Sequence, residues 1–345
     1  MKRYRKISAI MLLAIMMVFT AACGNSGSTN KSNSGGTTNN TTQSSNSGNT
    51  SSDKKITLGF AQVGAESGWR TANTKSIQDS AADAGIDLKF SDAQQKQENQ
   101  IKALRSFIQQ KVDVIAFSPV VESGWDTVLK EAKDANIPVI LVDRAVDSQD
   151  ESLYVSFIGS DFVEEGRKAG RWLLDQFKDA KEPINIVELQ GTTGSAPAND
   201  RKAGFEEIIK DNANLQIIAS QTGDFTRAKG KEVMQAFLKA HKDIDVLYAH
   251  NDDMALGAIQ AIEAAGLKPG EDIIIISVDA VKDGMIAASE GKINYIVECN
   301  PLMGPQVMQM VKDLVDGKEL PKRIATDETA FTSEEAKAAL PTRAY

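Results

Sequence analysis

The sequence predicts an α/β fold in which parallel sheets are covered by helices on both faces. Three copies of one unit support this prediction: a helical stretch that ends at Gly or Asn, followed by a short apolar strand that ends in Asp. The helical stretches end at Gly85, Asn136 and Gly266, where a helix C-terminus favours a left-handed residue. The strands are almost entirely Ile, Val and Leu, as expected for sheets covered on both faces. This alternation of helix and strand indicates parallel sheets.

The positions of the strands predict where a ligand would bind. The expected strands are residues 56–60, 86–90, 112–117, 138–142, 184–189, 246–249 and 273–278. In open parallel sheets, ligands bind outside the carboxyl ends of the strands. The polar segments at those ends are residues 62–70, 92, 143–144, 190–201, 250–253, 279 and 298–300. Asp252 and Asp253 open a helix expected over 254–265, so capping is an equally good interpretation of these two.

Residues 1–22 are predicted to be a signal peptide. Four basic residues precede the uncharged apolar run 7–20, which is too short for a comfortable membrane span. Cys23 follows two Ala residues, which resembles the bacterial lipobox, in which the signal is cut before a Cys that carries lipid. Thr20 stands where Leu is usual in that motif. An ordinary secretory signal with an incidental Cys is the alternative.

The segment after the signal is predicted to be a tether. Residues 24–53 are almost entirely Gly, Ser, Thr and Asn, which bury too little apolar surface to fold. With Cys23, they form a lipidated, disordered linker, 23–53, ahead of a folded body that exceeds the usual size of a single core. Two domains are therefore expected. Cys299 is the only other Cys, so no internal disulfide is expected, and no second long apolar run follows.

Charge and motifs argue against nucleic-acid binding and against catalysis. Removal of the four basic signal residues takes the formal net charge from −8 to −12, which is unfavourable for nucleic acid. The chain has two His, no Cys-x-x-Cys and no nucleophile-elbow, zinc-protease, Walker A or dinucleotide motif. No cofactor, metal or catalytic residue is expected. Asp143 and Asp279 are a candidate glycosidase pair, but Arg neighbours would keep both ionised.

The polar segments have instead the makeup of a sugar site. Carboxylates accept hydrogen bonds from sugar hydroxyls, whereas Arg and Asn donate to them, and charge-assisted bonds are the strong ones. An aromatic ring covers the apolar C–H face of a sugar. Trp69, directly after the first strand, and Phe225 are the candidates for this role. Core packing is the alternative for each of them.

The same segments resemble a known family. Residues 142–144, 200–205, 249–255 and 277–279 are similar, in the same order, to segments of the type I periplasmic sugar-binding proteins of ABC transporters, the ribose-binding class. Within that class, runs 59–70, 94–103 and 223–226 are most similar to the galactofuranose binders. The resemblance covers essentially all of 55–345.

The resemblance implies two doubly wound parallel-sheet lobes joined by a three-strand hinge. The first lobe would be 55–159 plus 299–326, and the second 160–298 plus 327–345. Arg70 stands where ribose binders have an aromatic residue, which disfavours ribose; Arg70 and Glu66 are candidates for contacts with an exocyclic diol. Glu298 lies at a hinge crossing. The ligand-binding residues expected are Glu66, Ser67, Trp69, Arg70, Asp143, Arg144, Thr193, Arg201, Phe225, Asn251, Asp279 and Glu298.

The function implied is that of an extracytoplasmic, monomeric binding lipoprotein of an ABC sugar importer. It would be anchored at the outer face of the cell membrane or lie in the periplasm, and deliver galactofuranose or a related furanose to the permease. A module that presents the sugar to a membrane receptor or histidine kinase is one alternative, and a ribose or other pentose binder is another. A LacI-like regulator would need a helix-turn-helix where the signal and tether lie, and a glycosidase is the enzyme alternative.

Overall fold

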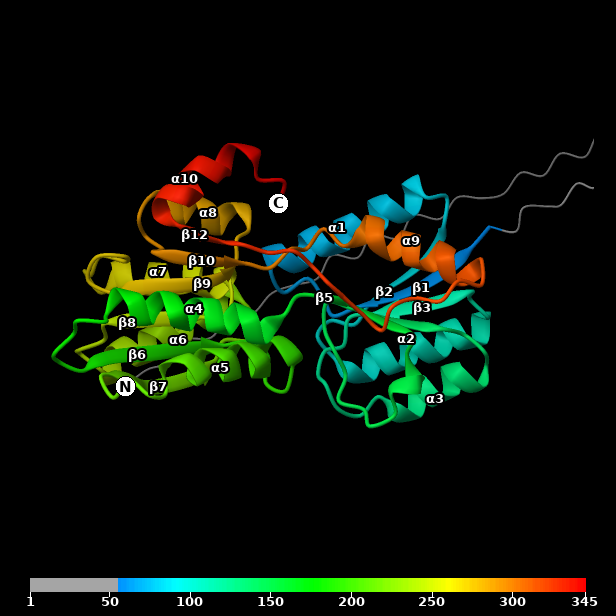
Figure 1. Ribbon diagram of the computed structural model, residues 1–345, viewed down its shortest axis with the longest axis horizontal. Helices are drawn as coiled ribbons and strands as arrows, with labels where there is room; N and C mark the ends of the chain where they lie inside the picture. Colours follow the sequence, from blue (N-terminus) through cyan, green and yellow to red (C-terminus); the bar gives the residue numbers. More distant parts are fainter. Residues whose placement is uncertain (1–54) are drawn as a thin grey trace, which may run out of the picture. The chain divides into compact units, whose positions relative to one another are not determined.

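The computed structural model describes residues 55–345, which form two six-stranded sheets (Figure 1). Sheet A has the strand order β11-β5-β4-β3-β1-β2, and sheet B has the order β12-β10-β9-β8-β6-β7. All neighbouring strands are parallel except β10 and β12. The predicted α/β fold with two parallel sheets is thereby confirmed. The predicted signal peptide, Cys23 and the tether lie outside the described residues.

Sheet A and the helices that cover it form the first lobe. Its strands are β1 (Thr57–Gln62), β2 (Asp87–Asp92), β3 (Val114–Phe117), β4 (Val139–Val142), β5 (Ser156–Gly159) and β11 (Arg323–Ala325). Helices α1 (Gly68–Asp83) and α9 (Gly304–Val315) cover one face, and α2 (Gln97–Gln110) and α3 (Asp126–Asp134) cover the other. A short 3₁₀ helix, Glu151–Leu153, precedes β5.

Sheet B and its helices form the second lobe. Its strands are β6 (Ile184–Gln190), β7 (Leu215–Thr222), β8 (Val246–Ala249), β9 (Ile274–Asp279), β10 (Tyr295–Glu298) and β12 (Ala330–Thr332). Helices α4 (Phe162–Gln176) and α5 (Ala196–Ile209) cover one face, and α6 (Arg227–Ala240), α7 (Asp252–Ala264) and α8 (Lys282–Ser289) cover the other. Helix α10 (Ser333–Ala339) packs against α8 and is followed by a 3₁₀ turn, Leu340–Thr342.

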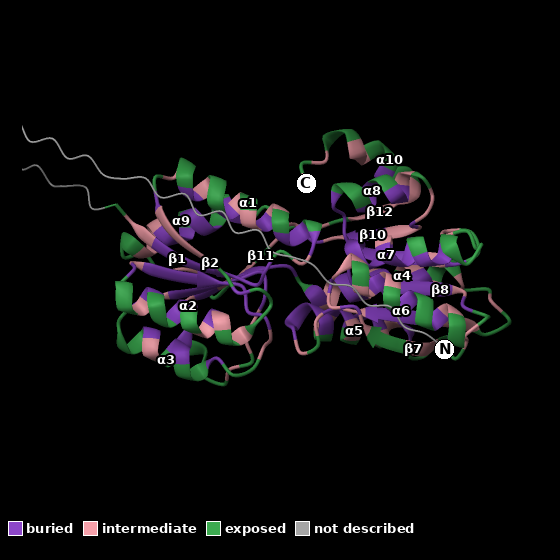
Figure 2. Ribbon diagram, turned by 180° about the vertical axis from the view of Figure 1, so that it is seen from behind, coloured by how far each residue is buried: buried purple, intermediate pink, exposed green. Residues whose placement is uncertain are grey.

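Alternate residues of each central strand enter opposite layers of the core. In β1, Leu58 and Phe60 pack with α1 and α9, whereas Ala61 packs with α2 and α3. Burial on both faces explains why these strands are apolar throughout instead of alternating with polar residues. Figure 2 shows the result: the central strands are buried, edge strands such as β7 are partly exposed, and the helices are buried on their inner sides and exposed on their outer sides.

All seven predicted strands are present, as β1 to β4, β6, β8 and β9, with ends shifted by up to two residues. The left-handed residues expected at three helix ends are also present, at Gly85 (φ +70°), Asn136 (φ +58°) and Gly266 (φ +80°). The sequence patterns did not predict β5, β7, β10, β11 or β12. Strands β11 and β12 have three residues each, too few for a periodic pattern, and exist because of long-range pairing.

The chain passes between the two sheets three times, because consecutive strands or helices belong to different lobes at three places. These crossings lie between β5 and α4, between β10 and α9, and between β11 and β12 (Figure 1).

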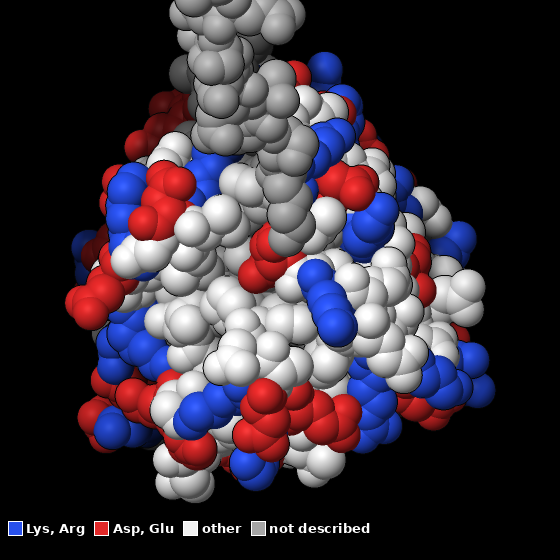
Figure 3. Space-filling view, turned by 90° about the vertical axis from the view of Figure 1, so that its right-hand side faces the viewer, with Lys and Arg blue, Asp and Glu red and all other residues white. Residues whose placement is uncertain are grey.

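On the part of the surface that described residues form in Figure 3, Lys and Arg are interspersed with Asp and Glu around a largely uncharged centre. Within residues 55–345, no helix has the length and apolar character needed to cross a bilayer.

Candidate functional site

A small cavity lies between the lobes and encloses about 280 Å³ of empty space, part of it open to solvent. Its walls come from the residues that follow or end strands in both sheets, together with the first turn of α1 and the first two turns of α5. The lining residues are Glu66, Ser67, Trp69, Arg70, Asp143, Arg144, Pro197, Arg201, Phe225, Asn251, Asp279 and Cys299. Ten of the residues expected from the sequence therefore meet at one place, where parallel strands end.

Arg70 organises the wall of the first lobe. Its Nε donates to Glu66 Oε1 (3.0 Å) and its Nη2 donates to Asp143 Oδ2 (2.6 Å). Its Nη1 donates to Gln62 Oε1 and to Ser118 Oγ, both at 3.2 Å. Burial lowers the pKa of the Arg70 guanidinium, but the Asp143 and Glu66 carboxylates outweigh it and raise the pKa overall. Because a guanidinium has five N–H groups, Arg70 keeps one for a ligand, and its main role is to hold the two carboxylates.

Two charged groups beside Arg70 have unused hydrogen-bonding capacity among the described residues. Glu66 Oε2 and Arg144 Nε are buried and have no hydrogen-bond partner in this part of the chain. The Nη1 atom of Arg144 donates to Val120 O at 3.1 Å, and this bond fixes the guanidinium. Burial, together with the nearby charge of Arg70, lowers the pKa of Arg144 to about 10, which leaves Arg144 charged at neutral pH. An acceptor and a donor are thus available at the cavity wall.

Arg201 is the guanidinium of the second lobe. Its Nε donates to Glu165 Oε2 at 2.7 Å, its Nη1 donates to His250 O at 2.5 Å, and its Nη2 lies 3.8 Å from Asp279 Oδ1. Burial lowers the pKa of Arg201, but nearby acidic groups, Glu165 first and Asp279 among them, together outweigh burial and raise the pKa overall. Glycine allows this arrangement, because a Cβ at Gly166 of α4 would lie 2.2 Å from Arg201 O of α5. Close contact between α4 and α5 therefore sets the position of Arg201.

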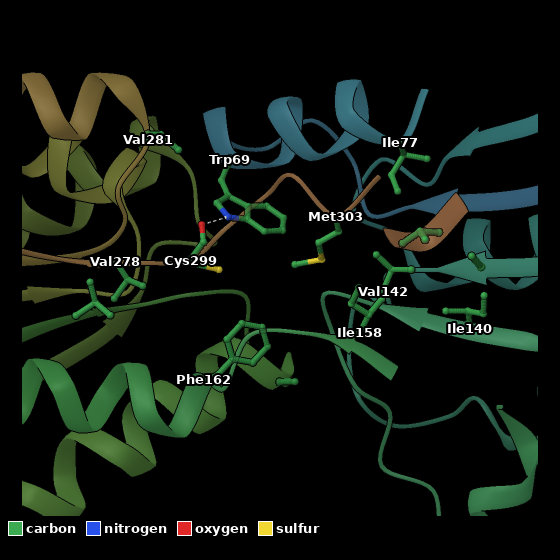
Figure 4. Close-up of a cluster of buried hydrophobic side chains, with 14 of the residues drawn as sticks. Trp69, Ile77, Ile140, Val142, Ile158, Phe162, Val278, Val281, Cys299 and Met303 are labelled. Atoms are coloured by element: carbon green, nitrogen blue, oxygen red, sulfur yellow. Dashed lines mark hydrogen bonds between the residues drawn. The ribbon is translucent and has the colours of Figure 1, made fainter. Parts of the chain in front are cut away.

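Trp69 lies at the boundary between the cavity and the hydrophobic core. It lines the cavity, and it is 4% exposed within a buried cluster that includes Phe162, Val281 and Met303 (Figure 4). Its Nε1 donates to Cys299 O at 2.7 Å, as the dashed line in Figure 4 shows. The Arg70 guanidinium carbon lies 4.7 Å from the centre of its ring. One indole therefore contacts the cavity, the core and the β10–α9 crossing.

Phe225 lies between the two lobes. The guanidinium carbon of Arg144 is 5.3 Å from the centre of its ring, and that of Arg201 is 5.9 Å away. Gly191 provides space for the ring, since a Cβ there would lie 1.9 Å from Phe225 Cζ. The Phe225 ring therefore contributes an apolar surface between two charged groups.

Three residues that line the cavity have strained backbone conformations. Asp143 (φ +67°), Phe225 (φ +60°) and Asp279 (φ +121°) have positive φ angles, which residues other than Gly rarely adopt. Such conformations persist where the surrounding structure holds them, and they are enriched at binding sites. Asn251 is also constrained, because its side chain accepts a hydrogen bond from Met254 N and caps α7. The cap is therefore Asn251, and Asp252 and Asp253 lie in the first turn of the helix.

The lobes are in contact on two sides of the cavity. Gly68 N, at the start of α1, donates to Asp253 Oδ2 of α7 at 2.7 Å. Elsewhere, Glu122 N donates to Gly194 O at 2.9 Å. Both bonds join residues of different lobes, so the described conformation is closed over the cavity.

Two of the expected residues lie outside the cavity lining. Thr193 is exposed on the loop after β6. Glu298 ends β10 at a crossing between the lobes, but its Oε1 accepts from Arg343 Nη1 (2.7 Å) and from the Tyr345 hydroxyl (2.8 Å). The Glu298 carboxylate is therefore hydrogen-bonded to the C-terminal residues at the crossing, and Glu298 does not line the cavity.

Sequence reasoning missed two lining residues, Pro197 and Cys299. Both lie in the segments that the sequence predicts as polar strand ends, residues 190–201 and 298–300. An apolar ring and a thiol are not among the strong hydrogen-bonding groups expected to bind sugar hydroxyls. Their position next to the expected residues is the only signal in the sequence that indicates them.

The fold and this cavity are those of a two-lobed binding protein, and the chain belongs to the periplasmic binding protein domain family, whose model matches residues 58–319. It is 51% identical to the galactofuranose-binding protein YtfQ of Escherichia coli K12, over 82% of this chain and 89% of that protein.

Two solved structures are also similar. A Mycobacterium smegmatis protein in complex with β-D-fucofuranose is 63% identical, with a TM-score of 0.82, over 83% of this chain and 94% of that one. The binding protein of the arabinose ABC transporter of Shewanella sp. ANA-3, bound to α- and β-L-arabinofuranose, is 52% identical, with a TM-score of 0.80, over 84% of this chain and 96% of that one.

Proposed function

We propose that this chain is the extracytoplasmic substrate-binding component of an ABC sugar importer and that it binds a furanose, galactofuranose first, between its lobes. The observation that carries the proposal is the cavity itself. Charged groups from both lobes, an amide and two aromatic rings surround the space between the lobes. Hydroxyl groups are both donors and acceptors, so they match this mixture of carboxylates and guanidinium groups. The similar proteins named above are described with furanose sugars, which supports the same ligand class.

The choice among furanoses rests on the polar groups that remain available. Galactofuranose carries an exocyclic diol that ribofuranose lacks. Glu66 Oε2 and Arg144 Nε, which have no hydrogen-bond partner within residues 55–345, are proposed to bind hydroxyls of this ligand. Ribose would leave such buried groups unpaired, at a cost of about 1–3 kcal/mol, or roughly ten- to a hundredfold in affinity. We therefore expect galactofuranose to bind at least tenfold more tightly than ribose or galactopyranose.

Calorimetric titration with galactose, L-arabinose, D-fucose and ribose tests the ligand class. Because these sugars are mixtures of ring forms, each apparent dissociation constant is corrected for the furanose fraction measured by NMR in the same solution. A titration with ¹³C-labelled galactose then identifies the bound ring from its anomeric carbon resonance. If ribose binds as tightly as galactose or more tightly, the protein is a ribose binder and the galactofuranose proposal is wrong. A bound pyranose resonance would exclude the furanose proposal.

The proposed mechanism is closure of the lobes on the sugar. The lobes are assigned as residues 55–159 with 299–326 and residues 160–298 with 327–345. Because each lobe contributes some of the contacts, the sugar favours the closed state by bridging them. The closed form would then dock on a permease as a monomer and release the sugar there. No reaction is proposed for this site.

Membrane attachment is proposed from the sequence. Cys23 would carry the lipid after removal of residues 1–22, and residues 24–53 would tether the lobes to the outer face of the membrane. A flexible chain of this length spans on the order of 30 Å. That reach would let the folded lobes meet a permease in the same membrane.

A further inference from the structure

Glu165 is a buried carboxyl directly behind the cavity. It lies on α4 and is 1% exposed, but it does not line the cavity. Its Oε2 accepts from Arg201 Nε at 2.7 Å, so it contacts the sugar site through the guanidinium. Its other oxygen, Oε1, is buried and has no hydrogen-bond partner within the described chain. The Glu165–Arg201 pair therefore links the cavity wall to a buried carboxyl oxygen that lacks a hydrogen-bond partner.

The charges around Glu165 are unbalanced. Arg201 of α5 is the cation that pairs with it, whereas Asp279 of β9 and Glu328, between β11 and β12, face the same region. The Cys299 sulfur and one carboxyl oxygen of each of Glu165 and Glu328 lie within 4.8 Å of one another. The Tyr248 hydroxyl of β8 is also nearby, and it is buried and neutral. Three carboxyls, the neutral Tyr248 hydroxyl and the neutral Cys299 thiol thus lie around the Arg201 guanidinium, and Arg323 is a second cation on the Glu328 side.

We propose that Glu165 is a positioning residue for the sugar site, and that closure on the sugar takes up a proton at this carboxyl, so that affinity rises as pH falls. As a positioning residue, it holds Arg201 by one oxygen while the protein shields the pair from water. As an acid, it accepts a proton because the Arg201 guanidinium is shared between two buried carboxyls, Glu165 and Asp279, with Glu328 close by. This inference rests on the proposed sugar binding and adds a pH dependence to it.

The direction of the effect follows from burial. Burial raises the pKa of Glu165 from its ordinary value of 4.5 to about 8, despite the opposing charge of Arg201, and Glu328 adds to the increase. Arg201 and Cys299 line the cavity, so separation of the lobes would expose them to water, and we expect the pKa of Glu165 to fall towards its ordinary value. The closed form therefore binds the proton more tightly than the open form does. The resulting gain in affinity is complete below the open-form pKa and is lost as pH rises through about 8.

Other groups in the cluster titrate in the same direction. Burial raises the pKa of Asp279, of the Cys299 thiol and of Glu328 above their usual ranges. Because these groups remain in a Glu165 variant, the test compares the pH profile of the variant with that of the wild-type protein.

The experiment measures galactose affinity from pH 5.5 to 9 for the wild type, Glu165→Gln and Glu165→Leu. The Gln side chain keeps an oxygen for Arg201 Nε but carries no proton to exchange. Glu164→Gln is the matched control, because Glu164 is the preceding residue of α4, is 37% exposed and pairs with Arg171 on the surface. Thermal melting at each pH verifies that every variant is folded.

We expect wild-type affinity to fall at least tenfold between pH 6 and pH 9, with a flatter profile for Glu165→Gln. The Gln variant should then bind more tightly than the wild type at pH 9, which no purely structural role would produce. The Leu variant should bind at least tenfold more weakly at every pH, and the Glu164→Gln profile should match that of the wild type. Calorimetry in buffers of different ionisation enthalpy should show proton uptake on binding for the wild type and less uptake for Glu165→Gln.

The possible outcomes test the proton uptake and the positioning role of Glu165 separately. A Gln variant with the wild-type slope and proton uptake would show that the proton binds elsewhere. If a folded Glu165→Leu variant binds sugar with wild-type affinity, Glu165 does not position Arg201. If that variant does not fold, the pH profile of Glu165→Gln alone tests the proposal. Absence of sugar binding by the wild-type protein at every pH would instead reject the proposed function.

Discussion

Replacement of Asp253 by Ala should weaken sugar binding although Asp253 does not line the cavity. Asp253 Oδ2 accepts from Gly68 N across the gap between the lobes at 2.7 Å. Its other oxygen accepts from Arg227 Nε of its own lobe at 3.1 Å, which holds the carboxylate in place. Gly68 begins α1, so the negative charge also meets the positive end of that helix. This contact exists only when the lobes are closed, and its loss should favour the open state.

The magnitude follows from the burial and charge of the contact. Asp253 is 7% exposed, so water screens the bond weakly. A hydrogen bond to a charged group contributes about 1.5–3 kcal/mol, and water in the variant recovers part of this. A net loss of about 1.4–2 kcal/mol corresponds to roughly ten- to thirtyfold in the dissociation constant. Most of the change should appear as faster dissociation, because the closed complex is what the contact stabilises.

Stopped-flow kinetics and calorimetry with galactose measure the effect, and urea unfolding without sugar measures stability. Asp283→Ala is the matched control: Asp283 lies in the first turn of α8 and accepts from the same Arg227 at 3.1 Å, but it makes no bond to the first lobe among the described contacts. The control should bind like the wild type, and both variants should unfold within about 1 kcal/mol of it. A dissociation constant for Asp253→Ala within twofold of wild type would refute this reasoning.

Two further predictions concern Trp69 and Cys23. Trp69→Ala should lose more than tenfold in sugar affinity and about 3–5 kcal/mol of unfolding free energy, because the indole contacts both the cavity and the core. Trp69→Phe should retain most of the stability. If calorimetry shows that Trp69→Ala binds sugar within twofold of the wild type, Trp69 serves the core alone. Cys23→Ser should move the protein from the membrane to the soluble fraction with unchanged sugar affinity, and a variant still in the membrane pellet would indicate an uncleaved signal.

Much of the fold was predictable because its signals are local. A buried parallel strand is a short apolar run, and a helix that ends at a left-handed Gly or Asn is marked by that residue. The central strands of both sheets, such as β1 and β9, were found in this way. The edge strands β11 and β12 were not, because three residues carry no periodicity and pair with segments far away in the chain.

The cavity was predictable only in outline. Parallel strands all end at one edge of a sheet, so a list of polar strand ends contained most of its lining. That rule does not tell which of these side chains face the cavity. Thr193 follows β6 as predicted but is exposed, and Glu298 ends β10 but is bound by the C-terminal residues.

The sequence by itself determined the α/β class, the apolar central strands and the polar residues placed at their ends, because each depends on neighbours a few positions away. The tertiary structure alone decided how those polar groups are used. Arg70 donates to Asp143, 73 positions later in the chain, and Trp69 donates to Cys299, 230 positions later. Hydrogen-bond partners and burial are set by packing between distant segments, and no local pattern carries that information.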